Sequence, residues 1–161
     1  MRIFPWVVVV AGLVAAAVMG AGRLGLLAGT APSHLGVTNG RLKPPSQNPN
    51  SVSSQAGLFP GHPQQTYAAI EPLKFQGDGE SAMLRLAKLL ASRADITIVE
   101  QRPDYIYARS STRWLRFTDD VEFWLDKPAA VIHMRSASRL GRKDFSANRA
   151  RMEALRAQFP A

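Results

Sequence analysis

The sequence contains no cysteine and only three histidines, which are His34, His62 and His133. Without cysteine, a disulfide framework, a thiolate metal site, a cysteine nucleophile and a lipid-modified cysteine are all excluded. The histidines lie far apart, so the usual zinc-ligand spacings are absent as well. We therefore expect no metal and no cofactor, and no catalytic residue is assigned.

Acidic residues are also scarce. Twelve Asp and Glu stand against twenty Lys and Arg, which gives a net charge of +8. Such a basic protein favours anionic surfaces. The chain has 161 residues, of which 46% are hydrophobic and 20% are charged. These values suit one ordinary globular domain and exclude global disorder.

The amino-terminal run Ile3–Ala21 contains no charged residue. As a helix it would be about 28 Å long, close to the hydrocarbon thickness of a bilayer. We predict a membrane anchor within residues 1–29, with residues 3–21 in the inner membrane. A cleaved signal peptide is the alternative. The run is longer than a typical signal segment, and the small residues near its end form a poor cleavage site.

The charges that flank this run are few. The amino group and Arg2 precede it, and Arg23 follows it. This balance weakly favours an amino terminus on the inside. An amino-terminal span followed by a long chain is commonly exported. We therefore expect a single-pass inner-membrane protein with a periplasmic carboxyl-terminal domain, part of the cell envelope.

Residues 30–65 are rich in Pro, Ser and Asn and show no apolar periodicity, which predicts an extended connector. Within it, residues 41–56 alternate Asn and Ser with Pro, a pattern that favours stacked turns. We expect 41–56 to pack on the folded part, residues 66–161.

The folded part shows alternating strand and helix signals. Asp78 can cap a helix that carries Met83, Leu86, Ala87 and Leu90 on one face. We predict strands at Ile96–Gln101, Tyr105–Ser110, Leu115–Leu125 and Ala130–Ala137. An earlier strand at Tyr67–Phe75 is weakened by Pro72.

A final helix is predicted at Phe145–Phe159, capped by Asp144 and stopped by Pro160. Its apolar stripe consists of Phe145, Met152, Leu155 and Phe159. The whole pattern predicts the α+β class: an amino-terminal transmembrane helix, then a small antiparallel sheet of four to five strands with two helices packed on one face.

One polar constellation stands out in this pattern. Asp119, Asp120 and Glu122 lie in an otherwise apolar strand, with Asp119 on the inward side. Asn148 falls within the apolar stripe of the last helix. Buried polar groups need partners, because each unsatisfied one costs about 1–3 kcal/mol. The basic segment that follows supplies such partners, and the candidate cluster consists of Asp119, Asp120, Glu122, Arg135, Ser136, Ser138, Arg139, Asp144, Asn148, Arg149 and Arg151.

Three interpretations of this cluster remain open. The first is structural: the acidic strand pairs with the basic strand and helix through Arg–carboxylate bonds. The second is an outward-facing anion site built from Arg, Ser and the start of the last helix. The third, a divalent-cation site on Asp120 and Glu122, is disfavoured by the competing arginines. A serine nucleophile at Ser136 or Ser138, with His133 as base, lacks the usual elbow motif.

The chain resembles a known family in four segments: PPSQNPNSVSSQ, YIYARS, RFTDDVEFWLD and RSASRLGRKDFSANRARMEALR. They are similar to the family catalogued as domain of unknown function 1499, over about residues 41–159. The resemblance implies a bacterial or plastid-type protein, often behind a membrane segment, with no agreed activity. Members often carry two cysteines where this chain has Pro44 and Ser51, so any thiol role of relatives is absent here.

Two functional hypotheses follow. The first is a non-catalytic binding or scaffold module of the cell envelope that docks an envelope protein or an anionic ligand. The second is an enzyme that acts on an anionic envelope substrate through Asp119, Asp120, Glu122 and the arginines. Nucleic acid is not an expected partner, because no recognised nucleic-acid motif is present.

Overall fold

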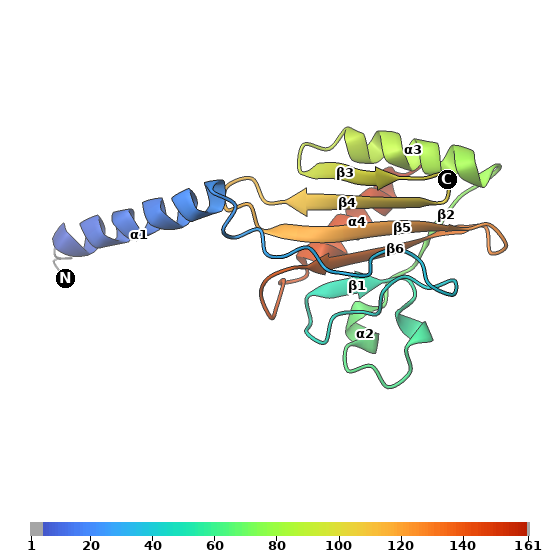
Figure 1. Ribbon diagram of the computed structural model, residues 1–161, viewed down its shortest axis with the longest axis horizontal. Coiled ribbons are helices and arrows are strands. Elements are labelled where there is room, and N and C mark those ends of the chain that lie inside the picture. Colours follow the sequence, from blue (N-terminus) through green and yellow to red (C-terminus); the bar gives the residue numbers. More distant parts are fainter. Residues whose placement is uncertain (1–4, 161) are drawn as a thin grey trace.

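The amino-terminal helix stands apart from the rest of the protein. The structure, a computed structural model, describes residues 5–160. The first two residues of the predicted span, together with Arg2 and Ala161, lie outside the described residues. Helix α1 (Pro5–Arg23) projects from one end of the sheet (Figure 1). Its apolar side chains are exposed nearly all round, and only 6% of the span is buried.

The folded part is built on an antiparallel sheet. Its six strands lie in the order β1-β6-β5-β4-β3, and β2 also pairs with β6. Their bounds are Ser51–Ser53 (β1), Leu73–Lys74 (β2), Ile96–Gln101 (β3), Tyr105–Ser111 (β4), Thr118–Asp126 (β5) and Val131–Ser138 (β6). The predicted α+β class is confirmed.

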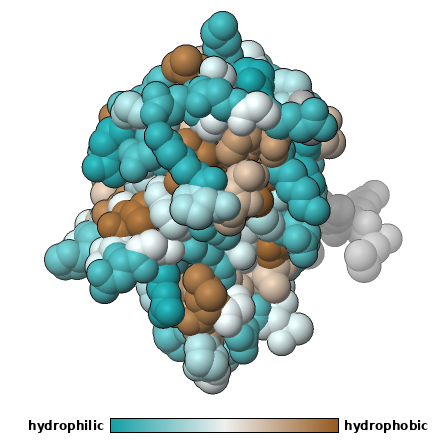
Figure 2. Space-filling model, turned by 90° about the vertical axis from the view of Figure 1, so that its right-hand side faces the viewer, coloured by the Kyte–Doolittle hydropathy of each residue, from teal (hydrophilic) through white to brown (hydrophobic). Residues whose placement is uncertain are grey.

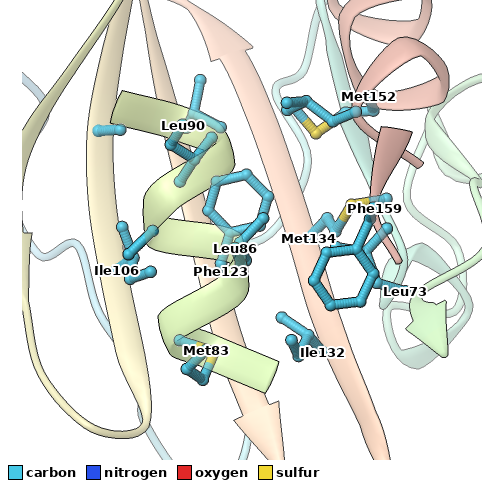
Figure 3. Packing of buried hydrophobic residues seen from close by; sticks show 14 of the residues in the cluster. Leu73, Met83, Leu86, Leu90, Ile106, Phe123, Ile132, Met134, Met152 and Phe159 are labelled. Carbon is cyan, nitrogen blue, oxygen red and sulfur yellow. The ribbon is translucent and has the colours of Figure 1, made fainter. Parts of the chain in front are cut away.

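Two helices cover one face of this sheet. They are α3 (Gly79–Ala91) and α4 (Ala147–Gln158). Asp78 caps α3 as predicted, because its carboxylate accepts the Ser81 N–H at 2.7 Å. The apolar faces of both helices meet the inward side chains of β4, β5 and β6 in one core (Figure 3), which includes Leu86, Leu90, Ile106, Phe123, Ile132, Met134, Met152 and Leu155. We call this side the helix face of the sheet.

The opposite side, which we call the outer face, is crossed by the chain that follows α1. Residues 34–44, the covering segment, lie over it. The Gly36 N–H donates to a Glu122 carboxylate oxygen at 2.8 Å, and the Pro44 carbonyl accepts from Arg135. Leu42 is buried in this segment, and its N–H donates to the Gln55 side chain at 2.8 Å. The outer face is therefore closed by extended chain instead of by a helix.

Two short helices follow β1 and complete the secondary structure. They are η1 (Ala56–Leu58) and α2 (Gln65–Ala68). The predicted strand at Tyr67–Phe75 is thus wrong over its first part, where Tyr67 and Ala68 end α2 and Ala69 forms only an isolated bridge with Ser53. Only Leu73 and Lys74 pair with β6, directly after Pro72. Proline cannot donate to a ladder, which explains why the pairing begins after it.

Two predicted boundaries need correction. The strand predicted at Leu115–Leu125 begins at Thr118, because residues 112–117 form a turn in which Arg116 has a φ of 58°. The last helix begins at Ala147 and not at Phe145, whose φ of 51° lies outside the helical region. Phe145 is 92% exposed and is therefore not part of the apolar stripe. Met152, Leu155 and Phe159 are buried as predicted.

Helix α3 offers a matched test of the core. Leu86 is fully buried, whereas Leu84 on the same helix is 57% exposed. We predict that Leu86→Ala lowers the free energy of unfolding by about 2–5 kcal/mol, because it removes apolar contacts and leaves a cavity. Leu84→Ala is expected to change it by less than about 0.5 kcal/mol. Urea unfolding of the full chain in a mild detergent measures both, and equal effects would contradict the assigned faces.

Candidate functional site

The candidate cluster is divided by the sheet into two parts. Successive strand residues point to opposite faces, so Asp119 lies on the helix face, while Asp120 lies on the outer face. In the same way, Ser136 and Ser138 point toward α4, and Arg135 points away from it. The sequence analysis already placed Asp119 on the inward side, and the structure divides the candidate residues into two clusters, one on each face of the sheet.

The outer-face cluster consists of two Arg–carboxylate pairs. Arg139 binds Asp120 in a bidentate manner, with Nε–Oδ2 and Nη2–Oδ1 distances of 2.9 and 2.7 Å. Arg135 Nη1 donates to Glu122 Oε2 at 3.0 Å. All four side chains are at most 6% exposed. Such buried pairs hold together because each charge would be strongly penalised without its partner.

Two tyrosines of β4 complete the outer-face cluster. The Tyr107 hydroxyl donates to Asp120 at 2.6 Å, and the Tyr105 hydroxyl donates to Glu122 at 2.9 Å. Burial, followed by the Asp120 hydrogen bond, raises the pKa of Tyr107. Burial and the charge of Glu122 raise the pKa of Tyr105. Both tyrosines are therefore held in the neutral, proton-donating form.

The helix-face cluster joins β5 and β6 to α4. Arg151 Nη2 contacts Asp119 Oδ2 at 2.6 Å. Asn148 is fully buried and donates to the Ser138 hydroxyl at 2.9 Å and to the Asn50 carbonyl at 3.1 Å. Its amide oxygen accepts from the Ser136 hydroxyl and from Arg151. Every polar atom of this buried amide is thus satisfied, as its inward placement requires.

Asp144 closes the start of α4. Its carboxylate accepts the N–H groups of Ser146 and Asn148, each at 3.0 Å, and the Tyr67 hydroxyl at 2.8 Å. Burial alone would raise the pKa of Asp144, but the hydrogen bonds from Tyr67 and Asn148 outweigh it, and the pKa lies below the usual value. The start of this helix is therefore already occupied by a carboxylate of the chain itself.

Arg149 belongs to neither cluster. Its guanidinium donates to the carbonyls of Tyr67 and Ala69. It therefore ties α4 to the end of α2, and it pairs with none of the three strand carboxylates.

His133 lies on the outer face, away from the serines of the same strand. Its Nδ1 is 3.1 Å from the Ser54 hydroxyl, and its Nε2 is 3.5 Å from Asp126. The ring stacks on Trp124 with centroids 5.4 Å apart. Ser136 and Ser138 point to the other face of β6, so His133 cannot act as their base.

The enzymatic interpretation requires that a substrate can reach the carboxylates of the acidic strand. Asp120 and Glu122 are buried, and arginines and tyrosines occupy their oxygens. A substrate could reach them only by displacing these partners and the covering segment. The described residues 5–160 contain no group of three His, Asp or Glu side chains spaced to hold a metal ion. What this arrangement can do is hold strands, helix and covering segment in register.

Several partners were missed by the sequence analysis. Tyr105 and Tyr107 alternate correctly to face the outer side, so strand periodicity could have placed them beside the acidic residues. Gly36, Pro44 and Asn50 could not have been found, because their contacts are made by backbone groups across more than eighty residues of sequence.

Comparison with known proteins agrees with the resemblance described above. The family model described as "Protein of unknown function (DUF1499)" matches residues 41–159. No curated protein and no solved structure matches the chain.

The outer-face cluster predicts a large effect of removing one charge. Arg139→Gln leaves the Asp120 carboxylate buried without its bidentate partner. We expect the free energy of unfolding to fall by about 3–5 kcal/mol. The double variant Asp120→Asn/Arg139→Gln should recover part of this loss, because no unpaired charge remains. Urea unfolding of the full chain measures each variant.

Arg142→Gln provides the control, because Arg142 is exposed near the same loop. It should change the free energy of unfolding by less than about 0.5 kcal/mol. The internal role of the cluster would be rejected if Arg139→Gln matched this control.

His133 predicts a pH dependence of stability. Burial lowers its pKa below the ordinary 6.5, although Asp126 opposes the shift. The folded state therefore favours the neutral ring, and its contribution is complete above pH 6.5. It declines as the pH falls from there toward the folded-state pKa. His133→Gln should remove this part of the slope, whereas His34→Gln, at an exposed position, should retain it. Denaturation at several pH values tests this, and identical slopes for all three proteins would contradict it.

Proposed function

The chain belongs to the DUF1499 family, and since that family has no assigned activity, we propose a function from the structure of this member. We propose that it is a membrane-anchored, non-catalytic binding or scaffold module of the cell envelope. In this proposal α1 remains attached in the inner membrane and holds the domain at its periplasmic surface.

The observation that carries this proposal is the character of α1. The helix is 19 residues long, and the window Trp6–Arg23 has a mean hydropathy of 1.9. Its length of about 28 Å suits a bilayer. A helix that is apolar all round and yet unburied favours a lipid environment. A signal sequence can have the same length and composition as this helix. The contacts between the end of α1 and the domain are therefore needed to distinguish an anchor from a cleaved signal.

That junction argues against cleavage beyond Gly29. Gly22, at the end of α1, packs so closely against Leu115 that an added Cβ would lie 2.7 Å from the Leu115 carbonyl oxygen. Gly29 packs equally closely on Arg139 and Leu140. Removal of the chain up to Ala31 would take away both glycines and expose these surfaces of the domain, whereas removal up to Ala21 would leave both in place.

The internal pairing of the carboxylates supports the non-catalytic part. The charged side chains at the centre of the sheet are used to bind one another, so ligand recognition is left to the surface of the domain. An orientation with the amino terminus inside agrees with Arg2 before the span and with the length of the chain after it.

The anchor predicts a specific loss of membrane association. Leu13→Arg places a charge near the middle of the span, which costs about 2.5–3.5 kcal/mol on insertion scales. We expect this variant to appear in the carbonate-soluble fraction, while the wild type and Leu26→Arg, beyond the end of α1, stay with the membranes. Intact-mass measurement should give the full 17.6 kDa. A shortened chain, or equal fractionation of all three proteins, would overturn the anchor.

The side of the membrane has its own test. A reporter enzyme that is active only after export, fused to the carboxyl terminus, should be active. A reporter that fluoresces only in the cytoplasm should be dark at the same position. The reverse pattern would reject the periplasmic location and leave the anchor in place.

A further inference from the structure

A hollow lies where α1 meets the sheet. It has a volume of about 760 Å³, within the usual range for ligand sites. Its walls come from the end of α1, the start of β3, the end of β4 and the turn between β4 and β5, residues 112–117, which we call the β4–β5 turn. Figure 1 shows these segments together at the end of the sheet that faces α1.

The hollow is strongly basic. Arg23, Arg109, Arg113 and Arg116 line it, and all four are exposed. Within residues 5–160, none of their guanidinium groups forms an ion pair or a hydrogen bond to a carboxylate or carbonyl. The acidic residue on the wall, Asp95, already contacts Arg93 at 3.3 Å. The four positive charges are therefore available to an external anion.

The β4–β5 turn holds two of these arginines in place. The Thr112 N–H donates to the Phe117 carbonyl at 3.0 Å, and the Phe117 N–H donates to the Thr112 hydroxyl at 3.1 Å. The Arg113 guanidinium lies 5.0 Å from the centre of the Trp114 ring. Leu115 packs against Gly22 of α1. The turn is thus closed on itself and fixed to the end of the anchor.

Exposed apolar side chains surround the same end of the domain. Leu24 and Leu26 follow α1, Trp114 lies on the β4–β5 turn, and Phe145 lies just before α4; each is at least 60% exposed. At the opposite end, hydrophilic residues cover most of the surface and apolar ones lie in separate patches (Figure 2). Aromatic and apolar groups beside basic ones are typical of the bilayer interface.

We propose that this hollow binds the phosphodiester headgroup of an anionic phospholipid. The inference rests on the proposed anchor, because α1 in a bilayer places the hollow beside the headgroups. Guanidinium groups match phosphate oxygens in geometry and charge. Basic residues next to a membrane span attract anionic lipid, and each contributes measurably near the surface. Trp114 and the leucines after α1 would lie among the upper parts of the lipid chains.

The test uses the full chain in neutral detergent micelles. Phosphatidylglycerol is added at increasing ratios, and native mass spectrometry counts the lipids that remain bound. Phosphatidylcholine replaces it in a second series, and free glycerol phosphate in a third. We expect phosphatidylglycerol to bind at least about tenfold more tightly than phosphatidylcholine, and this preference should weaken as salt is raised.

Two double variants with equal loss of charge make the comparison specific. Arg113→Gln/Arg116→Gln removes two charges from the hollow and should weaken phosphatidylglycerol binding by about tenfold or more. Arg85→Gln/Arg102→Gln removes two charges elsewhere and should bind like the wild type. Arg109→Gln serves as an independent single change in the hollow. Circular dichroism confirms that each variant is folded.

Each outcome decides the proposal. Equal binding by the two double variants, or equal binding of the two lipids, would overturn it. Binding of free glycerol phosphate as tight as that of the lipid would also overturn it, since a soluble phosphate site would then be present. The intact mass of the same samples reports separately on the anchor, so a retained α1 with no lipid preference rejects only this inference.

Discussion

The structure depends on pairing three buried carboxylates with three arginines. Asp119, Asp120 and Glu122 lie within one strand of a small domain, where water reaches none of them freely. An isolated ion in such a place would cost several kcal/mol. Each carboxylate is therefore bound by a guanidinium from β6, from the chain just after it, or from α4. This requirement fixes where the carboxyl-terminal third of the chain must lie.

The alternation of β5 explains why both faces of the sheet are secured by the same strand. On the helix face, Asp119 binds Arg151 of α4. On the outer face, Asp120 and Glu122 bind the other two arginines. Hydrophobic contacts of Met152 and Leu155 bring α4 to the sheet but are not directional. The hydrogen bonds of the Asn148 amide and the Arg151 ion pair are directional, because their partners on the sheet lie opposite them at only one position of α4.

Periodicity was enough to predict α3, α4 and the strands β3 to β6, as well as the inward position of Asn148, but it missed β1, η1 and α2. Both boundary errors, at the starts of β5 and α4, fall at turns. Arg116, Phe145 and Ser146 adopt positive φ values, which cannot be predicted from their residue types. A strand pattern that runs through such a turn is read as one longer strand. Alternation along the strand also separated Asp119 from Asp120 and Glu122, but it could not assign an arginine to each carboxylate, because that pairing depends on the register of β5 with β6 and on the position of α4. Only the end of the covering segment, residues 41–44, was expected to pack on the domain; the contact of Gly36 with Glu122 has no sequence signal, since a backbone group makes it.

The covering segment has a consequence for the anchor. Residues 24–33 span the short distance from α1 to the outer face, and there the Gly36 N–H joins the Glu122–Arg135 pair. Together with the contacts of Gly22 with Leu115 and of Gly29 with Arg139 and Leu140, this ties the chain at the end of α1 to the domain at three places. A flexible tether would let the domain turn freely relative to α1, whereas attachments at Leu115, at Arg139 and at the Glu122–Arg135 pair restrict that rotation. The same carboxylates that organise the sheet therefore also help to fix the basic hollow relative to α1.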